Sequence, residues 1–163
     1  MDWTGSPDQL KRERTRTTDA VARDGDARGE AAVPRAGACY DGAPESIAAA
    51  RSFTAEFLTR VRAVFGLQVS AEATATSQLV VSELVTNACK YAPGPCLLDL
   101  EVTGGLMEIT VWDANPVPPV VCGTDPGRVG RHGLEIVLAL CESLDITLPP
   151  VGKRITARVA LAR

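Results

Sequence analysis

The sequence predicts an α+β fold, a two-layer α/β sandwich with helices on one face of a mixed, mostly antiparallel sheet. Two observations support this prediction. Candidate elements follow in the order strand, helix, helix, hairpin, loop, helix, hairpin, and strands joined as hairpins pair antiparallel. Gly104 and Gly105 separate two partly alternating apolar stretches, which is a strong signal for a two-residue hairpin turn.

Composition narrows the class of protein. The chain has 163 residues, a net charge of −3 and a sequence pI of about 5.2, so we expect one domain and no direct binding of nucleic acid. Its five cysteines are widely spaced and form no C-x-x-C pair. We expect them to be reduced and to behave as small apolar residues. Because no long apolar run or signal-peptide pattern is present, we expect a cytoplasmic protein that does not contact a membrane.

Residues 1–35 are charged, rich in glycine and poor in large apolar side chains. Such a segment cannot bury enough surface to offset the entropy lost on ordering. We interpret it as a disordered tail, with a regulatory tail as the alternative. Its KRERTR run is followed closely by acidic residues, so we do not interpret it as a nucleic-acid site. Residues 36–163 are expected to form the folded domain.

The sequence of the first half of this domain predicts a strand followed by two helices. A short strand is expected at residues 37–40. A helix then begins near Pro44 and continues to about residue 65, where Gly66 suits the position after a helix end. The second helix, residues 72–92, contains no helix breaker, and Pro93 and Gly94 end it.

The second half predicts two hairpins separated by a loop and a helix. Strands are expected at residues 96–103 and 106–112, on either side of the Gly-Gly turn. A loop of about twenty residues rich in Pro and Gly follows, and so long a loop in a small domain is usually functional or mobile. A helix at residues 134–140 precedes two last strands, near 143–148 and 153–160.

The second helix carries a polar stripe beside its apolar face. At about 100° per residue, Glu83, Asn87 and Lys90 fall on one narrow stripe, next to apolar residues that include Val81 and Leu84. Polar groups at such an edge are expected to be partly buried, where they need a partner. Taken alone, the Glu–Asn pair is more often an ordinary solvated pair. A bound metal, water or phosphate would also satisfy it.

Two downstream features favour a ligand site. Asp113 ends a predicted strand, where a carboxylate can accept a hydrogen bond from an exocyclic amine. Gly127, Gly130 and Gly133 lead into a helix, and the unpaired N–H groups of a helix N-terminus bind anions. The amide oxygen of Asn87 is a suitable ligand for Mg²⁺. In this order the features indicate a nucleotide site.

These motifs resemble those of a known superfamily. E-L-V-x-N-A, a strand-end Asp and G-x-x-G-L-x-I-V are similar to the GHKL superfamily, the Bergerat-fold ATP-binding proteins that include gyrase, MutL and the histidine kinases. ELVTNACKYA and GRHGLEIVLALCESL most resemble the anti-sigma-factor serine/threonine kinases and their actinobacterial single-domain relatives. The resemblance covers about residues 38–161. It implies ATP and Mg²⁺ as cofactors, and a histidine-kinase/gyrase-like ATP-binding domain over residues 36–163.

The resemblance also implies roles for individual residues. Asn87 matches the Mg²⁺ ligand, Glu83 the catalytic residue that orients or deprotonates the attacking water or serine hydroxyl, and Asp113 the acceptor of the adenine amino group. Arg128 and Arg131 are better candidates for binding phosphate than His132, because a guanidinium can donate two parallel hydrogen bonds to a pair of phosphate oxygens. Lys90 matches less closely a position at which relatives often have a basic residue near the phosphates; the alternative is that Lys90 is an ordinary surface lysine. The further nucleotide-binding residues expected are Lys90, Asn115, Arg128, Gly130, Arg131, Gly133 and Leu134.

One motif departs from the family pattern, and two functions therefore stay open. The first glycine box is usually D-x-G-x-G, whereas Asn115 and Val117 stand at its glycine positions. Asn can adopt the left-handed conformation that glycine would, but Val117 removes the second glycine. The retained Glu83 favours a kinase that phosphorylates a small antagonist (anti-anti-sigma) protein and binds a sigma factor. The altered box favours a degenerate nucleotide-binding switch or partner-binding module without phosphoryl transfer.

Other members of the superfamily fit less well. The chain is short for a histidine kinase with a dimerisation helix pair, and it shows no transducer domain of the gyrase type. A homodimer stays open.

Overall fold

A computed structural model of the chain describes residues 32–92, 94–115 and 133–162. Residues 1–31 and most of the predicted long loop lie outside the described residues. Residues 32–163 belong to one unit, and the carbonyl oxygen of Pro34 accepts a hydrogen bond from the N–H of Val102. The elements of this unit are β1 (Arg35–Tyr40), α2 (Glu45–Phe65), α3 (Ala71–Tyr91), β2 (Cys96–Thr103), β3 (Leu106–Asp113), α4 (Gly133–Leu140), β4 (Ser143–Thr147) and β5 (Lys153–Ala160).

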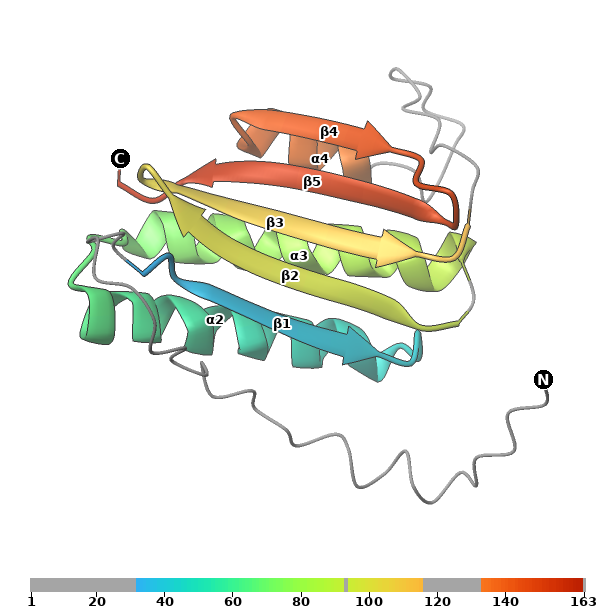
Figure 1. The fold of residues 1–163 in the computed structure, drawn as a ribbon, viewed down its shortest axis with the longest axis horizontal. Helices are drawn as coiled ribbons and strands as arrows, with labels where there is room; N and C mark the ends of the chain where they lie inside the picture. The colour runs from blue at the N-terminus through green and yellow to red at the C-terminus, as the bar shows by residue number, and fades with distance from the viewer. Residues whose placement is uncertain (1–31, 93, 116–132, 163) are drawn as a thin grey trace, which may run out of the picture. The chain divides into compact units, whose positions relative to one another are not determined.

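The five strands form one sheet in the order β1-β2-β3-β5-β4. Every pairing between described strands is antiparallel. The hairpin predicted between β2 and β3 is present, and Gly104 and Gly105 both have positive φ angles, 59° and 78°. Helices α2, α3 and α4 all lie behind the sheet in Figure 1. The predicted α+β sandwich with helices on one face is therefore confirmed.

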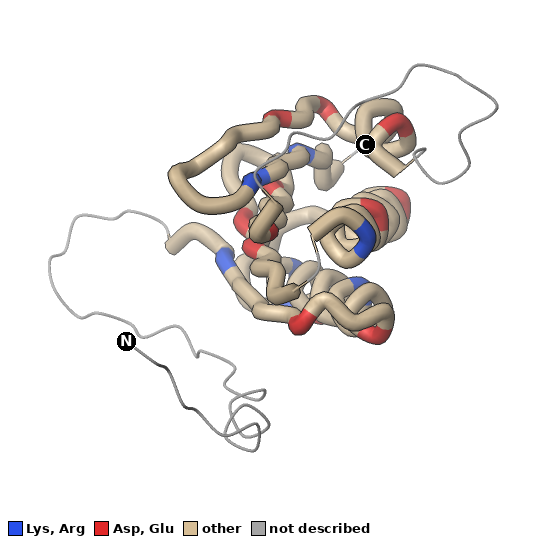
Figure 2. Tube along the Cα trace, turned by 90° about the vertical axis from the view of Figure 1, so that its right-hand side faces the viewer, with Lys and Arg blue, Asp and Glu red and all other residues tan. Residues whose placement is uncertain are grey.

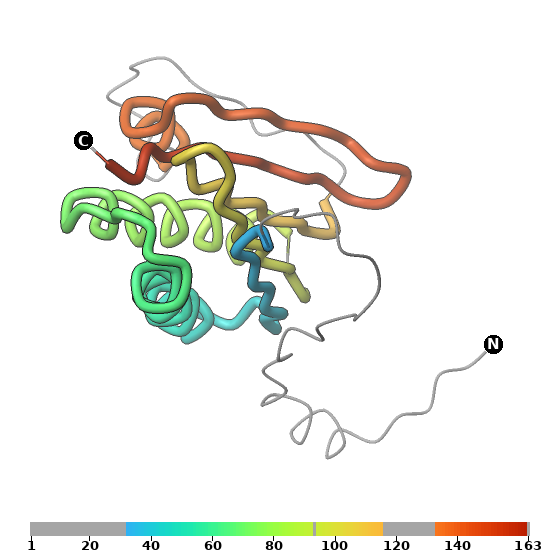
Figure 3. The backbone as a smooth tube through the Cα atoms, turned by 60° about the vertical axis from the view of Figure 1, so that its left-hand side comes forward, coloured from blue at the N-terminus to red at the C-terminus, as the bar shows by residue number. Residues whose placement is uncertain are grey.

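α3 lies between α2 and α4 in the helical layer (Figure 3). α2 ends as predicted, with Gly66 in the left-handed conformation at φ 63°. α3 begins one residue earlier than predicted, because the hydroxyl of Ser70 caps it by accepting a hydrogen bond of 2.9 Å from the N–H of Ala73. Such a cap satisfies one of the N–H groups that a helix start leaves unpaired. α3 is therefore a well-anchored central helix.

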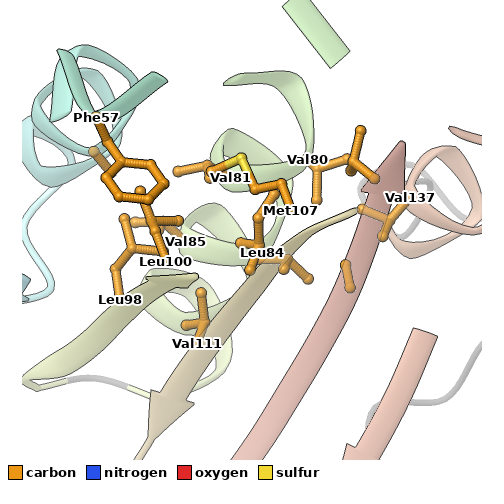
Figure 4. Close-up of a cluster of buried hydrophobic side chains, with 14 of the residues drawn as sticks. Phe57, Val80, Val81, Leu84, Val85, Leu98, Leu100, Met107, Val111 and Val137 are labelled. Atoms are coloured by element: carbon orange, nitrogen blue, oxygen red, sulfur yellow. The ribbon is translucent and has the colours of Figure 1, made fainter. Parts of the chain in front are cut away.

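The core fills the space between the helical layer and the sheet. The predicted apolar face of α3 is fully buried, with Val81, Leu84 and Val85 each at most 1% exposed. Figure 4 shows these side chains between Phe57 of α2 and Val137 of α4. Burying one such aliphatic side chain contributes about 1.5–3 kcal/mol. Because this face of α3 is fixed by packing, the polar stripe beside it is held in a defined position.

The face of the sheet opposite the helices is charged. Arg158 donates hydrogen bonds to Glu108 at 2.9 Å and to Asp145 at 2.6 Å, and the guanidinium of Arg154 lies 5.0 Å from the centre of the Trp112 ring. Figure 2 shows acidic and basic residues interspersed along the chain. A depression of about 400 Å³ on this face is lined largely by these groups. The charged side chains on this face are therefore largely satisfied by one another.

Two further expectations concern the whole domain. The described cysteines Cys39, Cys89, Cys96 and Cys141 are free thiols, as predicted. Cys96 is buried, but Cys39 is exposed and so is not a core residue. Among the described helices, none is long and apolar enough to cross a membrane.

Candidate functional site

Glu83 and Gly133 come together where α3 contacts α4. Gly133 is the first residue of α4, and a Cβ built on it would lie 2.5 Å from Oε2 of Glu83. The glycine therefore leaves room for the carboxylate at the start of the helix. The first N–H groups of a helix lack intrahelical partners, and the helix dipole favours negative charge there. Glu83 thus lies beside the helix terminus at which the sequence predicts phosphate binding.

Asn87 follows Glu83 by one turn of α3. Its Oδ1 atom is buried and accepts no hydrogen bond from the described residues. A buried acceptor left unsatisfied costs about 1–3 kcal/mol, so a water, cation or ligand group at this position would be stabilising. The described part of the chain contains no cluster of three or more His, Cys, Asp or Glu that could hold a metal ion. A single amide oxygen fits Mg²⁺, which keeps several waters and takes its other ligands from phosphates.

Asp113 lies buried at the end of β3, where both of its carboxylate oxygens already have partners. Oδ1 accepts a hydrogen bond of 2.9 Å from the N–H of Asn115, and Oδ2 lies 3.2 Å from Nζ of Lys153. The side chains of Asp113 and Lys153 are only 3% and 1% exposed. A carboxylate offers about four acceptor positions, so Asp113 can still accept a hydrogen bond from a bound group. It is held firmly enough to do so in one orientation.

Lys153 is a site residue that sequence reasoning missed. It is the first residue of β5 and pairs with Asp113 in the β3–β5 register. Along β5 it shares the inward face with Ile155, Ala157 and Val159, all buried. A lysine on an apolar face is rarely buried without a partner, and this pattern was the available signal. The partner itself was not predictable, because α4 and β4 separate the two strands in sequence.

Two contacts frame the end of β3. Gly152 has a φ of 78°, and a Cβ on it would collide with the carbonyl oxygen of Asp113, so the β4–β5 turn packs directly on the Asp113 backbone. On the other side, Nδ2 of Asn115 donates a hydrogen bond of 2.8 Å to the carbonyl oxygen of Tyr91 at the end of α3. Asn115 therefore connects the sheet to α3 at the position of the first glycine box.

The remaining predicted site residues contribute less to this geometry. Lys90 is exposed in the last turn of α3. Leu134 is 7% exposed and its side chain belongs to the core, so its backbone N–H is the group that could contact a ligand. The predicted residues outside the described part of the chain are Arg128, Gly130 and Arg131, together with Val117, Gly127 and His132.

Comparison with known proteins agrees with the observed fold. The histidine kinase-like ATPase domain family matches residues 41–159, whereas no curated protein matches the chain significantly. The solved structure of the RsbU and RsbW domains of Rv1364c from Mycobacterium tuberculosis is similar to this chain at a TM-score of 0.60 and 18% identity. The match covers 80% of this chain and 32% of that one, so this chain spans about a third of its length. At this identity the likeness concerns the fold.

Two structures of a blue-light activated histidine kinase from Erythrobacter litoralis EL346 align less closely. Its histidine kinase domain aligns at a TM-score of 0.43 and 21% identity, over 68% of this chain and 60% of that one. The second structure of that kinase aligns at 0.44 and 20% identity, over 66% and 42%.

Proposed function

The chain belongs to the histidine kinase-like ATPase domain family, and on this premise we propose that it is an ATP-binding regulatory protein with kinase activity. The specific proposal is a serine/threonine kinase of the anti-sigma-factor type, which uses Mg-ATP to phosphorylate a small antagonist protein in the cytoplasm and also binds a sigma factor. One observation carries it: the Glu83 carboxylate lies at the N-terminus of α4, against Gly133. A general base is thereby next to the expected phosphate position.

The described residues supply the nucleotide contacts. Asp113 accepts a hydrogen bond from the adenine amino group with its remaining acceptor positions. The N-terminus of α4 binds phosphate oxygens through unpaired N–H groups. The unsatisfied Oδ1 of Asn87 would hold Mg²⁺, which when bound supplies neutralisation of the phosphate charge. These three groups come from β3, α4 and α3, which the core packs together.

Phosphoryl transfer then needs mainly correct positioning. Glu83 accepts the proton of a serine hydroxyl on the bound partner. The hydroxyl oxygen forms a bond to the γ-phosphorus, while the bond from that phosphorus to the β–γ bridging oxygen breaks and ADP leaves. Because Glu83 is on the same face of α3 as Asn87, one turn away, both groups can act on the same triphosphate.

A second candidate is a nucleotide-binding switch that binds partners without transferring phosphate. The side chain of Asn115 is engaged by the Tyr91 carbonyl oxygen, at a position where relatives have a glycine. The side chain of Asn115 therefore connects the end of β3 to α3, which a glycine could not do. Such a site can bind nucleotide without the glycine that the first glycine box usually has at this position.

A transfer assay separates the two candidates. The full chain is incubated with γ-labelled ATP and Mg²⁺, with and without candidate antagonist proteins that carry serine. We expect label on a partner serine, and we expect it to disappear when Mg²⁺ is chelated. Binding of ATP without transfer to any partner supports the switch, and absence of ATP binding contradicts both candidates.

A further inference from the structure

Lys153 and Asp113 form a buried ion pair at the proposed base-binding end of the site. Nζ and Oδ2 are 3.2 Å apart, and Lys153 is the only buried cation among the described residues. Gly152, the preceding residue, lets the turn pack against the Asp113 backbone. Taking two charges out of water is expensive, and the pair repays this only with good geometry and further hydrogen bonds. The N–H of Asn115 supplies one of these to Oδ1.

We propose that Lys153 determines the base specificity of the nucleotide site by holding Asp113, through the ion pair to Oδ2, as the group that accepts a hydrogen bond from the base. This inference rests on the proposed function, in which Asp113 contacts the base. An ionised carboxylate accepts from the 6-amino group of adenine and repels the 6-oxo group of hypoxanthine or guanine. A protonated carboxyl has an O–H donor and would accommodate a 6-oxo group. Lys153 is thus a positioning residue that acts through Asp113.

Among the described residues, Lys153 is the only buried positive charge that can hold the Asp113 carboxylate. Burial favours the neutral form of a carboxyl group unless an opposite charge is close. Burial, more than the neighbouring thiols and carboxylates, raises the pKa of Cys96 on β2 to about 11, so this thiol is uncharged near neutral pH. Asp41 after β1 and Lys90 on α3 are both exposed.

Titration calorimetry with two purine nucleotides tests the proposal. Mg-ATP and Mg-ITP differ at the 6-position of the base, and the ratio of their affinities cancels effects common to both, such as protonation of the triphosphate. For wild type we expect ATP to be preferred by at least about a hundredfold, since a site built on a hydrogen bond strongly rejects an analogue without it.

Lys153→Gln is the informative variant, because it keeps a donor for Oδ2 but removes the positive charge. Its preference for ATP should be at least about tenfold lower than that of wild type, because the carboxylate loses the charge that holds it. Arg154→Gln is the matched control. It removes the neighbouring charge, which stacks on Trp112 on the opposite face, and should leave the ratio unchanged.

The outcomes separate this inference from the proposed function. A folded Lys153→Gln protein with the wild-type ratio overturns the inference. If that variant does not fold, Lys153→Arg decides, because it keeps the positive charge: the wild-type ratio in Lys153→Arg supports the role of the charge, and a lost preference overturns it. Binding of ATP with no preference over ITP overturns the inference and leaves the nucleotide site standing. Binding of neither nucleotide refutes the proposed function itself.

Discussion

Glu83 of α3 and Gly133 of α4 lie so close together that a Cβ on the glycine would be 2.5 Å from Oε2 of the glutamate. The atom in the way is the end of a flexible side chain. A larger residue at position 133 would therefore displace the carboxylate and leave the two helices in place. This pair offers a way to move the proposed general base without removing it.

Gly133→Ala should reduce phosphoryl transfer while keeping the protein folded. Alanine is favoured over glycine in helices, and the atom that it would meet belongs to a flexible side chain, so the free energy of unfolding should change little. A displaced base lowers the rate of transfer more than it lowers the affinity for Mg-ATP. Transfer rates and chemical denaturation measure the two effects. In a Glu83→Ala background the same substitution should have no further effect on rate; an equal loss in both backgrounds contradicts the contact.

Asn87→Ala should stabilise the nucleotide-free protein by about 1 kcal/mol, because it removes a buried acceptor that has no partner among the described residues. The same change should weaken binding of Mg-ATP. Ser77→Ala is the matched control, since the Ser77 hydroxyl oxygen is also buried and unsatisfied within the described structure. It should stabilise the protein and leave Mg-ATP affinity unchanged. Calorimetry that finds normal Mg-ATP affinity in Asn87→Ala rules out the metal-ligand assignment.

Asp113→Ala should destabilise the protein as well as abolish adenine selectivity. It leaves Lys153, which is 1% exposed, as a buried charge without its partner, and breaking such a pair costs about 3–5 kcal/mol. The double variant Asp113→Ala/Lys153→Met removes both charges and should recover much of this loss. Denaturant unfolding measures the stability, and competition between ATP and GTP measures the selectivity. Equal affinity of wild type for ATP and GTP would exclude Asp113 as the base-reading residue.

Cys96 should react much more slowly than exposed Cys39 near neutral pH. Burial raises its pKa from 9.0 to about 11, and the thiolate is the reactive form. The folded protein thus favours the protonated thiol. Its contribution to stability is present below pH 9 and is lost as the pH rises toward 11. Iodoacetamide labelling followed by mass spectrometry should modify exposed Cys39 first, and early labelling of Cys96 would contradict its burial.

Local sequence rules predicted the helices and strands because residues close in the chain determine where several of these elements end. Gly66 ends α2 with a positive φ angle, and the Gly104-Gly105 turn fixes the β2–β3 register. Periodicity also identified the buried face of α3, and hence the stripe that carries Glu83 and Asn87. These signals depend on residues that are close in the chain.

The pairing of distant residues was not predictable in the same way. Lys153 faces Asp113 only because β5 inserts between β3 and β4, and neither strand encodes that order by itself. The contact of Glu83 with Gly133 likewise depends on how α4 packs on α3. The conformational freedom of Asn suggests that Asn115 can replace a glycine, yet its side chain is held by the Tyr91 carbonyl oxygen. A local conformational preference does not report such a tertiary contact.

Glu83→Ala is the test that separates a kinase from a nucleotide-binding switch. Glu83 lies one turn before Asn87 and against the start of α4, so it reaches the expected γ-phosphate region without itself holding the nucleotide. Loss of a general base typically lowers the rate by about 10²–10⁴-fold with little change in ground-state binding. We therefore expect near-normal Mg-ATP affinity by calorimetry and transfer to the partner at least about a hundredfold slower.

The control for this variant is Glu72→Ala, which removes an exposed carboxylate from the first turn of the same helix and should leave both affinity and rate unchanged. A rate loss confined to Glu83→Ala identifies the carboxylate at the α4 N-terminus as the base, because the two variants remove the same group from the same helix. If wild type transfers no phosphate to any serine-bearing partner and Glu83→Ala binds nucleotide and partners as wild type does, the kinase proposal fails. The position of Glu83 against Gly133 would then serve only to fill the space between α3 and α4, as expected for a switch.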